Sequence, residues 1–166
     1  MISVTLRQVI SGDVDWILQA CQDLEIQRWT QVPRPYSREH ALSFVTGTTD
    51  EFARWVVQVG APSEPVGVIG IHEVEDSVAS IGYWIGPQYR GRGFTTAAIG
   101  LVCEEIEQYR SESGTEVGFV RAFIARDNSA SRRAVERAGF EMVEAQLGPA
   151  VEDLVPVPTC VYMKTL

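Results

Sequence analysis

The sequence has little cysteine, histidine and positive charge, and each shortage excludes a class of protein. Its three cysteines are far apart and odd in number, so neither a disulfide framework nor a metal-binding pair is expected. The two histidines lie in no HExxH or CxxC context, so we expect no metal site. Lys and Arg total 14 against 22 Asp and Glu, which leaves a formal net charge of −8. That balance argues against a nucleic-acid binder that works through phosphate contacts.

Long apolar runs are also absent. No stretch is apolar for long enough to span a bilayer, and the N-terminus, MISVTLRQVI, lacks the basic start and apolar core of a signal peptide. We therefore expect no membrane partner. Hydrophobic residues make up 45% of the chain and charged residues 22%, which is ordinary for a soluble globular protein. We expect one domain, residues 1–166, a monomer or homodimer in the cytoplasm, with Cys21 and Cys103 as buried free thiols.

The most informative stretch runs from Tyr83 to Tyr109. An apolar run ends at Ile85, a Gly-Pro break follows, and the basic turn Arg90–Gly93 leads into a segment whose apolar residues recur with helical spacing. A strand, a glycine turn and a helix in this order form a phosphate-binding geometry. Glycines let the backbone approach an anion, and the first helical N–H groups have no partner inside the helix. The helix is expected to bury one face, at Phe94, Ala98, Ile99, Val102, Cys103 and Ile106.

Two common phosphate-binding motifs are excluded in this stretch. The GxxxxGK[ST] loop needs a Lys-Ser or Lys-Thr pair, which does not occur here, and the dinucleotide motif GxGxxG fails because the sixth position from Gly91 is Thr96. What remains is the pattern R/Q-x-x-G-x-G/A. We begin it at Arg90 because Phe94 and the helix start then follow the last glycine, although a register that begins at Gln88 also fits. The plain alternative is an ordinary strand–helix turn with solubilising arginines.

Hydrophobic spacing, caps and turn residues predict the order of elements along the whole chain. The first helix is expected to bury one face, at Ile17, Ala20, Cys21 and Leu24. A loop over residues 27–36 is expected to expose Trp29. Strands are expected at 2–10, 52–59, 66–74, 78–85, 117–124, 140–145 and 158–166, with a long loop at 146–157 and helices after Ser11 or Asp13, from Ser37 to about Gly47, from Phe94, and from Asn128 or Ser129 to Arg137.

The resulting order, β-α-α-β-β-β-α-β-α-β-β, predicts a mixed, mostly antiparallel sheet with helices on both faces. This order and four local patterns resemble the GNAT superfamily of N-acetyltransferases, and within it the RimJ/RimL-like branch that acetylates ribosomal-protein N-termini. The resemblance covers essentially the whole chain. It implies an α/β (α+β) fold with a seven-stranded mixed sheet, flanked by about four helices and splayed between the fourth and fifth strands. The four patterns are Glu25–Thr30, Ile81–Ile85, Gly91–Thr96, and Asn128-x-x-Ser131 leading to Gly139-Phe140.

The resemblance implies that acetyl-CoA is the donor substrate and that no metal takes part. Its pyrophosphate would lie on backbone N–H groups of the glycine turn, and its pantetheine arm would pair with the free strand edge at Tyr83–Ile85. A backbone N–H near Ile85 would polarise the thioester carbonyl. For the side chains of Tyr83 and Trp84, core packing is the alternative. The residues implied for donor binding are Tyr83, Trp84, Ile85, Arg90, Gly91, Arg92, Gly93, Phe94, Thr95, Thr96, Asn128 and Ser131.

The catalytic acid and base depart from the family pattern. The tyrosine that often protonates the leaving thiolate corresponds to Val135, which cannot donate a proton, so the resemblance to the RimL branch points to Ser131 instead. The glutamate that often precedes the Gly-Tyr-Trp pattern is Ser80, and Ala97 replaces a further glutamate. The base therefore stays open among Glu73, Glu75, Glu144, His72 and water.

These residues predict an N-acetyltransferase that moves an acetyl group to a primary amine by direct attack. The acceptor is a protein N-terminus or a small amine, because one fold hosts many acceptors. Trp29 and Tyr83 are the expected substrate-binding residues, since the loop that carries Trp29 joins two helices that wall the acceptor side in the family. The alternative is a non-catalytic acyl-CoA-binding or sensing protein, which the departures at Ser80 and Val135 would suit.

Overall fold

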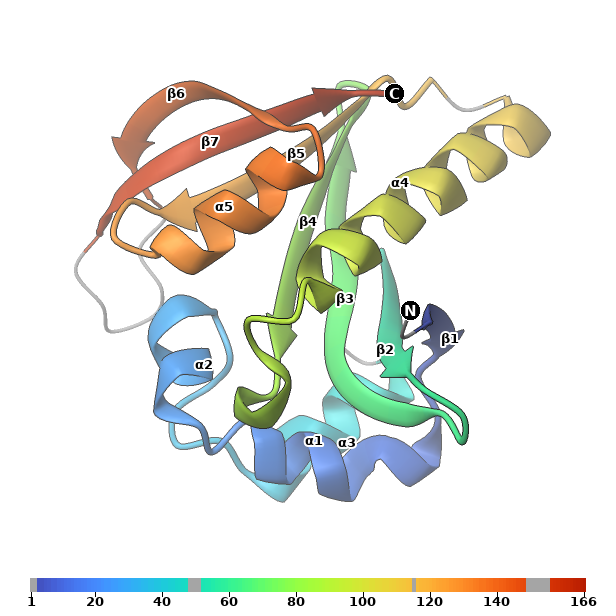
Figure 1. Cartoon of the computed structure of the whole chain (residues 1–166), viewed down its shortest axis with the longest axis vertical. Helices are drawn as coiled ribbons and strands as arrows, with labels where there is room; N and C mark the ends of the chain where they lie inside the picture. Colours follow the sequence, from blue (N-terminus) through green and yellow to red (C-terminus); the bar gives the residue numbers. More distant parts are fainter. Residues whose placement is uncertain (1–2, 48–51, 115, 149–155) are drawn as a thin grey trace.

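A seven-stranded sheet crosses the molecule in the order β1-β2-β3-β4-β5-β7-β6 (Figure 1). The computed structural model describes residues 3–47, 52–114, 116–148 and 156–166. The strands are β1 (Val4–Gln8), β2 (Ala53–Val59), β3 (Glu64–Glu75), β4 (Val78–Ile85), β5 (Phe119–Ala125), β6 (Glu141–Leu147) and β7 (Pro158–Thr165). The helices are α1 (Val14–Ala20), α2 (Leu24–Trp29), α3 (Arg38–Thr46), α4 (Phe94–Ser113) and α5 (Ser129–Arg137), with short 3₁₀ turns at η1 (Ser11–Asp13) and η2 (Pro87–Tyr89).

One parallel pair interrupts the antiparallel sheet, and it opens partway along. Residues Val78–Ile81 of β4 pair with residues 119–122 of β5. Beyond Ile81 and Ala122 no pairing joins the two strands, although β4 continues to Ile85 and β5 to Ala125. All other neighbouring strands are antiparallel. This confirms the predicted mixed sheet and its splay between the fourth and fifth strands.

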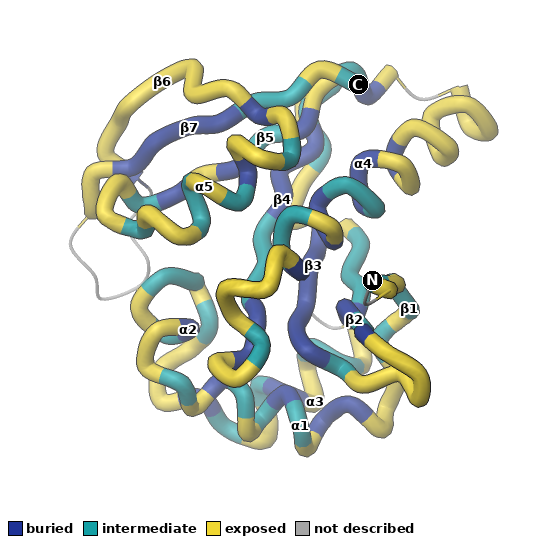
Figure 2. Tube along the Cα trace, in the orientation of Figure 1, coloured by how far each residue is buried: buried dark blue, intermediate teal, exposed yellow. Residues whose placement is uncertain are grey.

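Helix α4 packs its predicted apolar face onto one side of the sheet. The six positions expected from the helical spacing are the six that the structure buries, from Phe94 to Ile106. They join a core with β-strand residues such as Ile69 and Val120 (Figure 2). Burying each large apolar side chain contributes about 1.5–3 kcal/mol, so this face anchors the helix and fixes where its N-terminus lies.

Helices α1, α2 and α3 cover a second apolar cluster on the opposite side of β3 and β4. Side chains alternate between the faces of a strand. Val68 and Trp84 accordingly pack with Ile17 and Ala41, whereas Ile69 and Tyr83 pack on the α4 side. Of the described helices, none is long and apolar enough to cross a membrane.

The first helical segment differs from the prediction. The spacing from Ile17 to Leu24 suggested one continuous helix, but α1 ends at Ala20, and Leu24 begins α2 with 77% of its surface exposed. The reason is local: the Asp23 carboxylate caps a new helix by accepting the Ile26 N–H at 3.0 Å. Trp29 therefore ends a helix instead of lying in a loop. The described residues contain five α-helices, one more than expected.

The other predicted elements match the structure within a few residues. Ser37 and Asn128 cap α3 and α5 as expected, each accepting a backbone N–H three residues ahead. The three cysteines are free and buried. Ile2 and most of the predicted loop at 146–157 lie outside the described residues.

A buried carboxylate joins β1 to the start of α1. Asp13, whose side chain is 3% exposed, accepts two hydrogen bonds from Arg7, at 2.7 and 2.6 Å, and one each from the Ile10 N–H and the Trp16 indole. Burial by itself raises the pKa of Asp13, but the bonds from Arg7, Ile10 and Trp16 outweigh burial and hold this pKa below its ordinary value. The carboxylate thus positions the helix layer that faces β3 and β4.

We expect Asp13→Asn to lower the free energy of unfolding by about 1–2 kcal/mol at pH 7, because it removes the charge that Arg7 binds. The folded pKa lies below the unfolded one, so this contribution is present above about pH 4 and is lost as the pH falls through the folded value. Urea unfolding at pH 7 and pH 3 measures the change. Asp15→Asn is the control, since Asp15 forms an exposed ion pair with Arg38. An equal loss from Asp13→Asn at both pH values would contradict the prediction.

Candidate functional site

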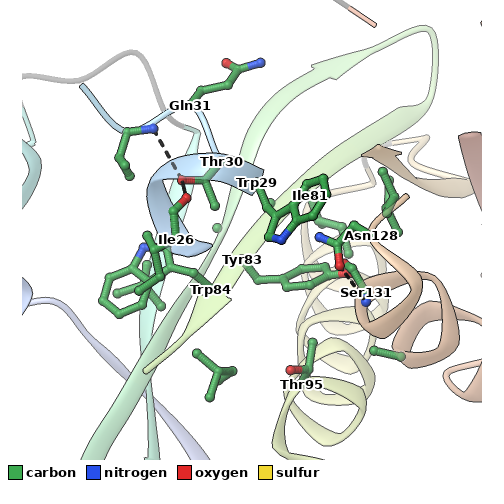
Figure 3. Close-up of a pocket in the computed structure, with 18 of the residues that line it drawn as sticks. Ile26, Trp29, Thr30, Gln31, Ile81, Tyr83, Trp84, Thr95, Asn128 and Ser131 are labelled. Atoms are coloured by element: carbon green, nitrogen blue, oxygen red, sulfur yellow. Dashed lines mark hydrogen bonds between the residues drawn. The ribbon is translucent and has the colours of Figure 1, made fainter. Parts of the chain in front are cut away.

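A deep cleft opens where β4 and β5 separate. It has a volume of about 1260 Å³. Strand β4 forms its floor, α2 and α3 line one side, and the starts of α4 and α5 line the other (Figure 3). Most of the predicted site residues line it: Trp29, Tyr83, Trp84, Ile85, Arg90, Gly91, Gly93, Thr95, Thr96, Asn128 and Ser131.

The floor of the cleft carries an unpaired backbone edge. Gly86 donates its N–H to the Val66 carbonyl at 2.8 Å, on the β3 side. Because successive residues of a strand direct their backbone groups to opposite edges, Tyr83 and Ile85 direct theirs toward the gap left by β5. The Ile85 carbonyl accepts a 3.1 Å hydrogen bond from Arg90 Nε. An extended, amide-bearing chain can pair with this edge as an added strand.

The glycine turn lies beside this edge at the N-terminus of α4. Gly91 and Gly93 have φ of 75° and 82°, in the left-handed region that favours glycine, and a Cβ at either position would meet nothing within 4 Å. Gly93 is the N-cap of α4, no side chain caps this end, and the first turn has no acidic residue. The turn therefore offers helical N–H groups and open space to an anion.

The side chains of the turn and of the first residues of α4 make different contacts. Arg90 forms an ion pair with Asp23, the capping residue of α2, so its guanidinium already has a partner. Arg92 is exposed and does not line the cleft, and the Phe94 side chain lies in the core. The Thr96 hydroxyl donates to the Ala134 carbonyl at 3.1 Å, which holds α4 against α5. At Phe94 only the backbone can serve the predicted donor site.

Two hydroxyl groups meet on the α5 side of the cleft. Tyr83 Oη lies 2.6 Å from Ser131 Oγ, and the Ser131 N–H donates to Asn128 Oδ1 at 3.1 Å (Figure 3). Burial raises the pKa of Tyr83 to about 12, so its phenol is protonated at neutral pH. The sequence pointed to Ser131 but not to this phenol. The strand alternation places Tyr83 on the α4 and α5 face, but only the position of α5 brings Ser131 to it.

A polar network lies on the other face of the sheet. Arg121 donates to Ser80 Oγ at 2.8 Å and to Glu73 Oε1 at 2.9 Å, and the Ser80 hydroxyl donates to the same Glu73 oxygen at 3.2 Å. The register of β3 and β4 shifts between Ile71 and Glu73. A carboxylate from β3 thus lies beside Ser80, the position at which the family pattern has a glutamate on β4.

Two of the four candidate bases line the cleft. His72 lies at the register shift, and its ring packs over Gly82, where a Cβ would come within 2.0 Å of Nε2. Glu73 also lines the cleft, whereas Glu75 and Glu144 are exposed and do not. In the described residues no group of three or more His, Cys, Asp and Glu is placed to hold a metal ion.

Trp29 is held in a fixed orientation at the end of α2. Its indole N–H donates to Glu25 Oε2 at 2.7 Å, and the Arg28 guanidinium carbon lies 4.5 Å from the ring centroid. The ring lines the cleft together with Tyr83 (Figure 3). It is therefore preorganised to contact a ligand.

Known proteins resemble both the sequence and the fold. The family model described as "Acetyltransferase (GNAT) domain" matches residues 3–141. A Bacillus subtilis (strain 168) protein named "Putative ribosomal N-acetyltransferase YdaF" is 36% identical over 76 residues, which span 45% of this chain and 39% of that protein. The microcin C7 self-immunity acetyltransferase MccE, in complex with acetyl-CoA and AMP, has a TM-score of 0.80 and 17% identity over 98% of this chain and 92% of that one. Spermidine N-acetyltransferase from Vibrio cholerae, in complex with CoA and spermine, has a TM-score of 0.78 and 16% identity over 98% and 95%.

Proposed function

The chain belongs to the GNAT acetyltransferase family, and we propose that it transfers the acetyl group of acetyl-CoA to a primary amine by direct attack of the amine. One observation carries the proposal: the unpaired edge of β4, the glycine turn and the Tyr83–Ser131 hydroxyl pair all line one cleft. The acetyl-CoA and CoA in the MccE and Vibrio cholerae complexes support this donor. Buried free cysteines suit the reducing cytoplasm that we propose as its location.

The donor fits the cleft from one end to the other. The uncapped start of α4 would bind the pyrophosphate through backbone N–H groups at Gly91–Thr96, where glycine leaves room for close approach. Tyr83 and Ile85 would pair with the pantetheine amides, with the Ile85 N–H directed at the thioester oxygen. Asn128 uses its carbonyl oxygen to cap α5, which leaves its amide NH₂ to donate to the same arm.

The acceptor would reach the thioester from the opposite side of β4. His72 and Glu73 line that side, and one of them would take the proton that the attacking amine must lose. As the carbon–sulfur bond breaks, the hydroxyl pair on the α5 side would supply a proton to the leaving sulfur. The word "ribosomal" in the YdaF name is consistent with the protein N-terminus that the RimJ/RimL resemblance implies, and the spermine complex is consistent with a small amine. Both acceptors offer a primary amine.

The direct test is release of CoA from acetyl-CoA in the presence of a panel of primary amines, with calorimetry to measure donor binding. We expect acetyl-CoA to bind and CoA release to depend on the amine. Donor binding without turnover on any amine would instead identify an acyl-CoA sensor.

We expect Trp29→Ala to raise the acceptor KM several-fold and to change the acetyl-CoA KM little, because the ring lines the acceptor side of the cleft and does not touch the glycine turn. Steady-state kinetics with each substrate varied in turn measures both constants. Trp55→Ala is the matched control, since Trp55 packs against the α4 core and does not line the cleft. Were both KM values to rise together in Trp29→Ala, the ring would be a packing residue.

A further inference from the structure

Three aromatic rings that line the cleft each lie against an arginine of this chain. The guanidinium carbon of Arg28 lies 4.5 Å from the Trp29 ring centroid. The corresponding distances are 5.2 Å from Arg54 to Phe44 and 4.8 Å from Arg121 to Phe123. A ring attracts a cation through its electron-rich face, and a guanidinium already on the ring weakens the attraction for a second cation.

The acidic groups of the cleft are also engaged. Glu25 and Glu73 are the only acidic residues among the described residues that line it. Glu25 accepts the Trp29 indole N–H at 2.7 Å and has Arg28 at 3.8 Å, while Glu73 accepts from Arg121 at 2.9 Å. A ligand with several positive charges would have to displace these partners, even though the protein as a whole is acidic.

What the acceptor side does offer is apolar surface. Five apolar side chains that belong to, or pack against, the second apolar cluster line this part of the cleft. Val32 and Trp84 are half-buried, whereas Ile26, Tyr36 and Val68 are buried and reach the cleft wall with only a small part of their surface. Trp84 is supported from behind by Trp16, with ring centroids 5.7 Å apart. Apolar and aromatic groups bind such a surface by leaving water.

We propose that the acceptor is a primary amine with one positive charge on an apolar body about the size of an aromatic side chain, and that polyamines are poor acceptors. The inference rests on the proposed acetyl transfer and narrows its substrate class. Two sources carry this chemistry: a free arylalkylamine and a peptide whose first residue is large and apolar.

The test compares kcat/KM for three acceptors at saturating acetyl-CoA, measured by release of CoA: 2-phenylethylamine, a tetrapeptide amide beginning with Phe, and spermidine. We expect one of the two monoamines to exceed spermidine by about tenfold or more, which corresponds to one well-placed apolar contact. The better of the two identifies the source. Equal or better use of spermidine would overturn the inference and leave acetyl transfer standing. No turnover on these three acceptors, with turnover on another amine of the panel, would also overturn the inference and leave acetyl transfer standing. No turnover on any amine of the panel, with donor binding intact, would overturn acetyl transfer and the inference with it.

A charge variant tests the role of the arginines. Arg28→Gln removes the positive charge that lies against the Trp29 ring and Glu25. We therefore expect kcat/KM for spermidine, divided by kcat/KM for 2-phenylethylamine, to rise about threefold. Arg38→Gln makes the same charge change at an exposed ion pair with Asp15, away from the cleft, and should leave the ratio unchanged. The same ratio in the wild type and both variants would show that Arg28 does not exclude polycations.

Discussion

Gly93→Glu is expected to weaken acetyl-CoA binding by about 100-fold or more, an effect of about 2.7 kcal/mol. The substitution has two effects, one on acetyl-CoA binding and one on stability. The new carboxylate lies at the N-terminus of α4, where it repels a pyrophosphate and blocks its approach to the backbone. The φ of 82° at this position also resists any residue other than glycine, at a cost of about 1–2 kcal/mol. Isothermal calorimetry measures the affinity, and thermal unfolding measures the strain.

Gly114→Glu separates the effect on binding from the effect on stability. Gly114 ends the same helix with a similar φ of 71°, and a Cβ there also meets nothing within 4 Å. This variant should lose stability through the same backbone strain, with a small further loss from a carboxylate at a helix C-terminus, and should bind acetyl-CoA like the wild type. Wild-type affinity in Gly93→Glu would remove the glycine turn from the donor site.

Ser131→Ala and Tyr83→Phe are each expected to lower kcat by about tenfold or more. General acids contribute about 10²–10⁴-fold, and a thiol that titrates near roughly 8.5 leaves more easily than most groups, which sets the lower bound. The hydroxyls lie 2.6 Å apart, so proton delivery to the leaving sulfur would use both. Because the pair acts as one unit, the double variant should be no slower than the slower single variant. The raised pKa of Tyr83, about 12, keeps the phenol protonated, so this step should not weaken between pH 7 and about pH 9.

Acetyl-CoA affinity distinguishes catalysis from binding in these variants. Calorimetry should find it nearly unchanged, since Asn128 and the glycine turn are intact. Val135→Ala is the control on the same helix: Val135 is 0% exposed, so its truncation should cost about 1–3 kcal/mol of stability and leave kcat unchanged. Turnover of Ser131→Ala at the wild-type rate would return Ser131 to a helix-surface role.

The site residues that sequence patterns found are those whose signal is local. The glycine turn, the buried stripe of α4 and the cap at Asn128 each follow from residues within one or two turns of each other. Their physical basis is also local: backbone freedom at glycine, helical periodicity, and a side-chain oxygen that satisfies a free N–H group. The wrong prediction of one continuous helix through Leu24 also has a local cause. The apolar spacing continues past Asp23, but the Asp23 side chain caps a new helix there.

The sequence by itself thus determined the family, the element order and the glycine turn at the start of α4, because these depend on short-range patterns. Only the tertiary structure decided which side chains meet across the cleft. Tyr83 and Ser131 are 48 residues apart, and so are Glu73 and Arg121. Periodicity says which face of an element is apolar but not which element will cover it. The shift in the β3–β4 register, which brings Glu73 beside Ser80, lies within one hairpin, but the alternation of apolar residues does not show where such a shift occurs.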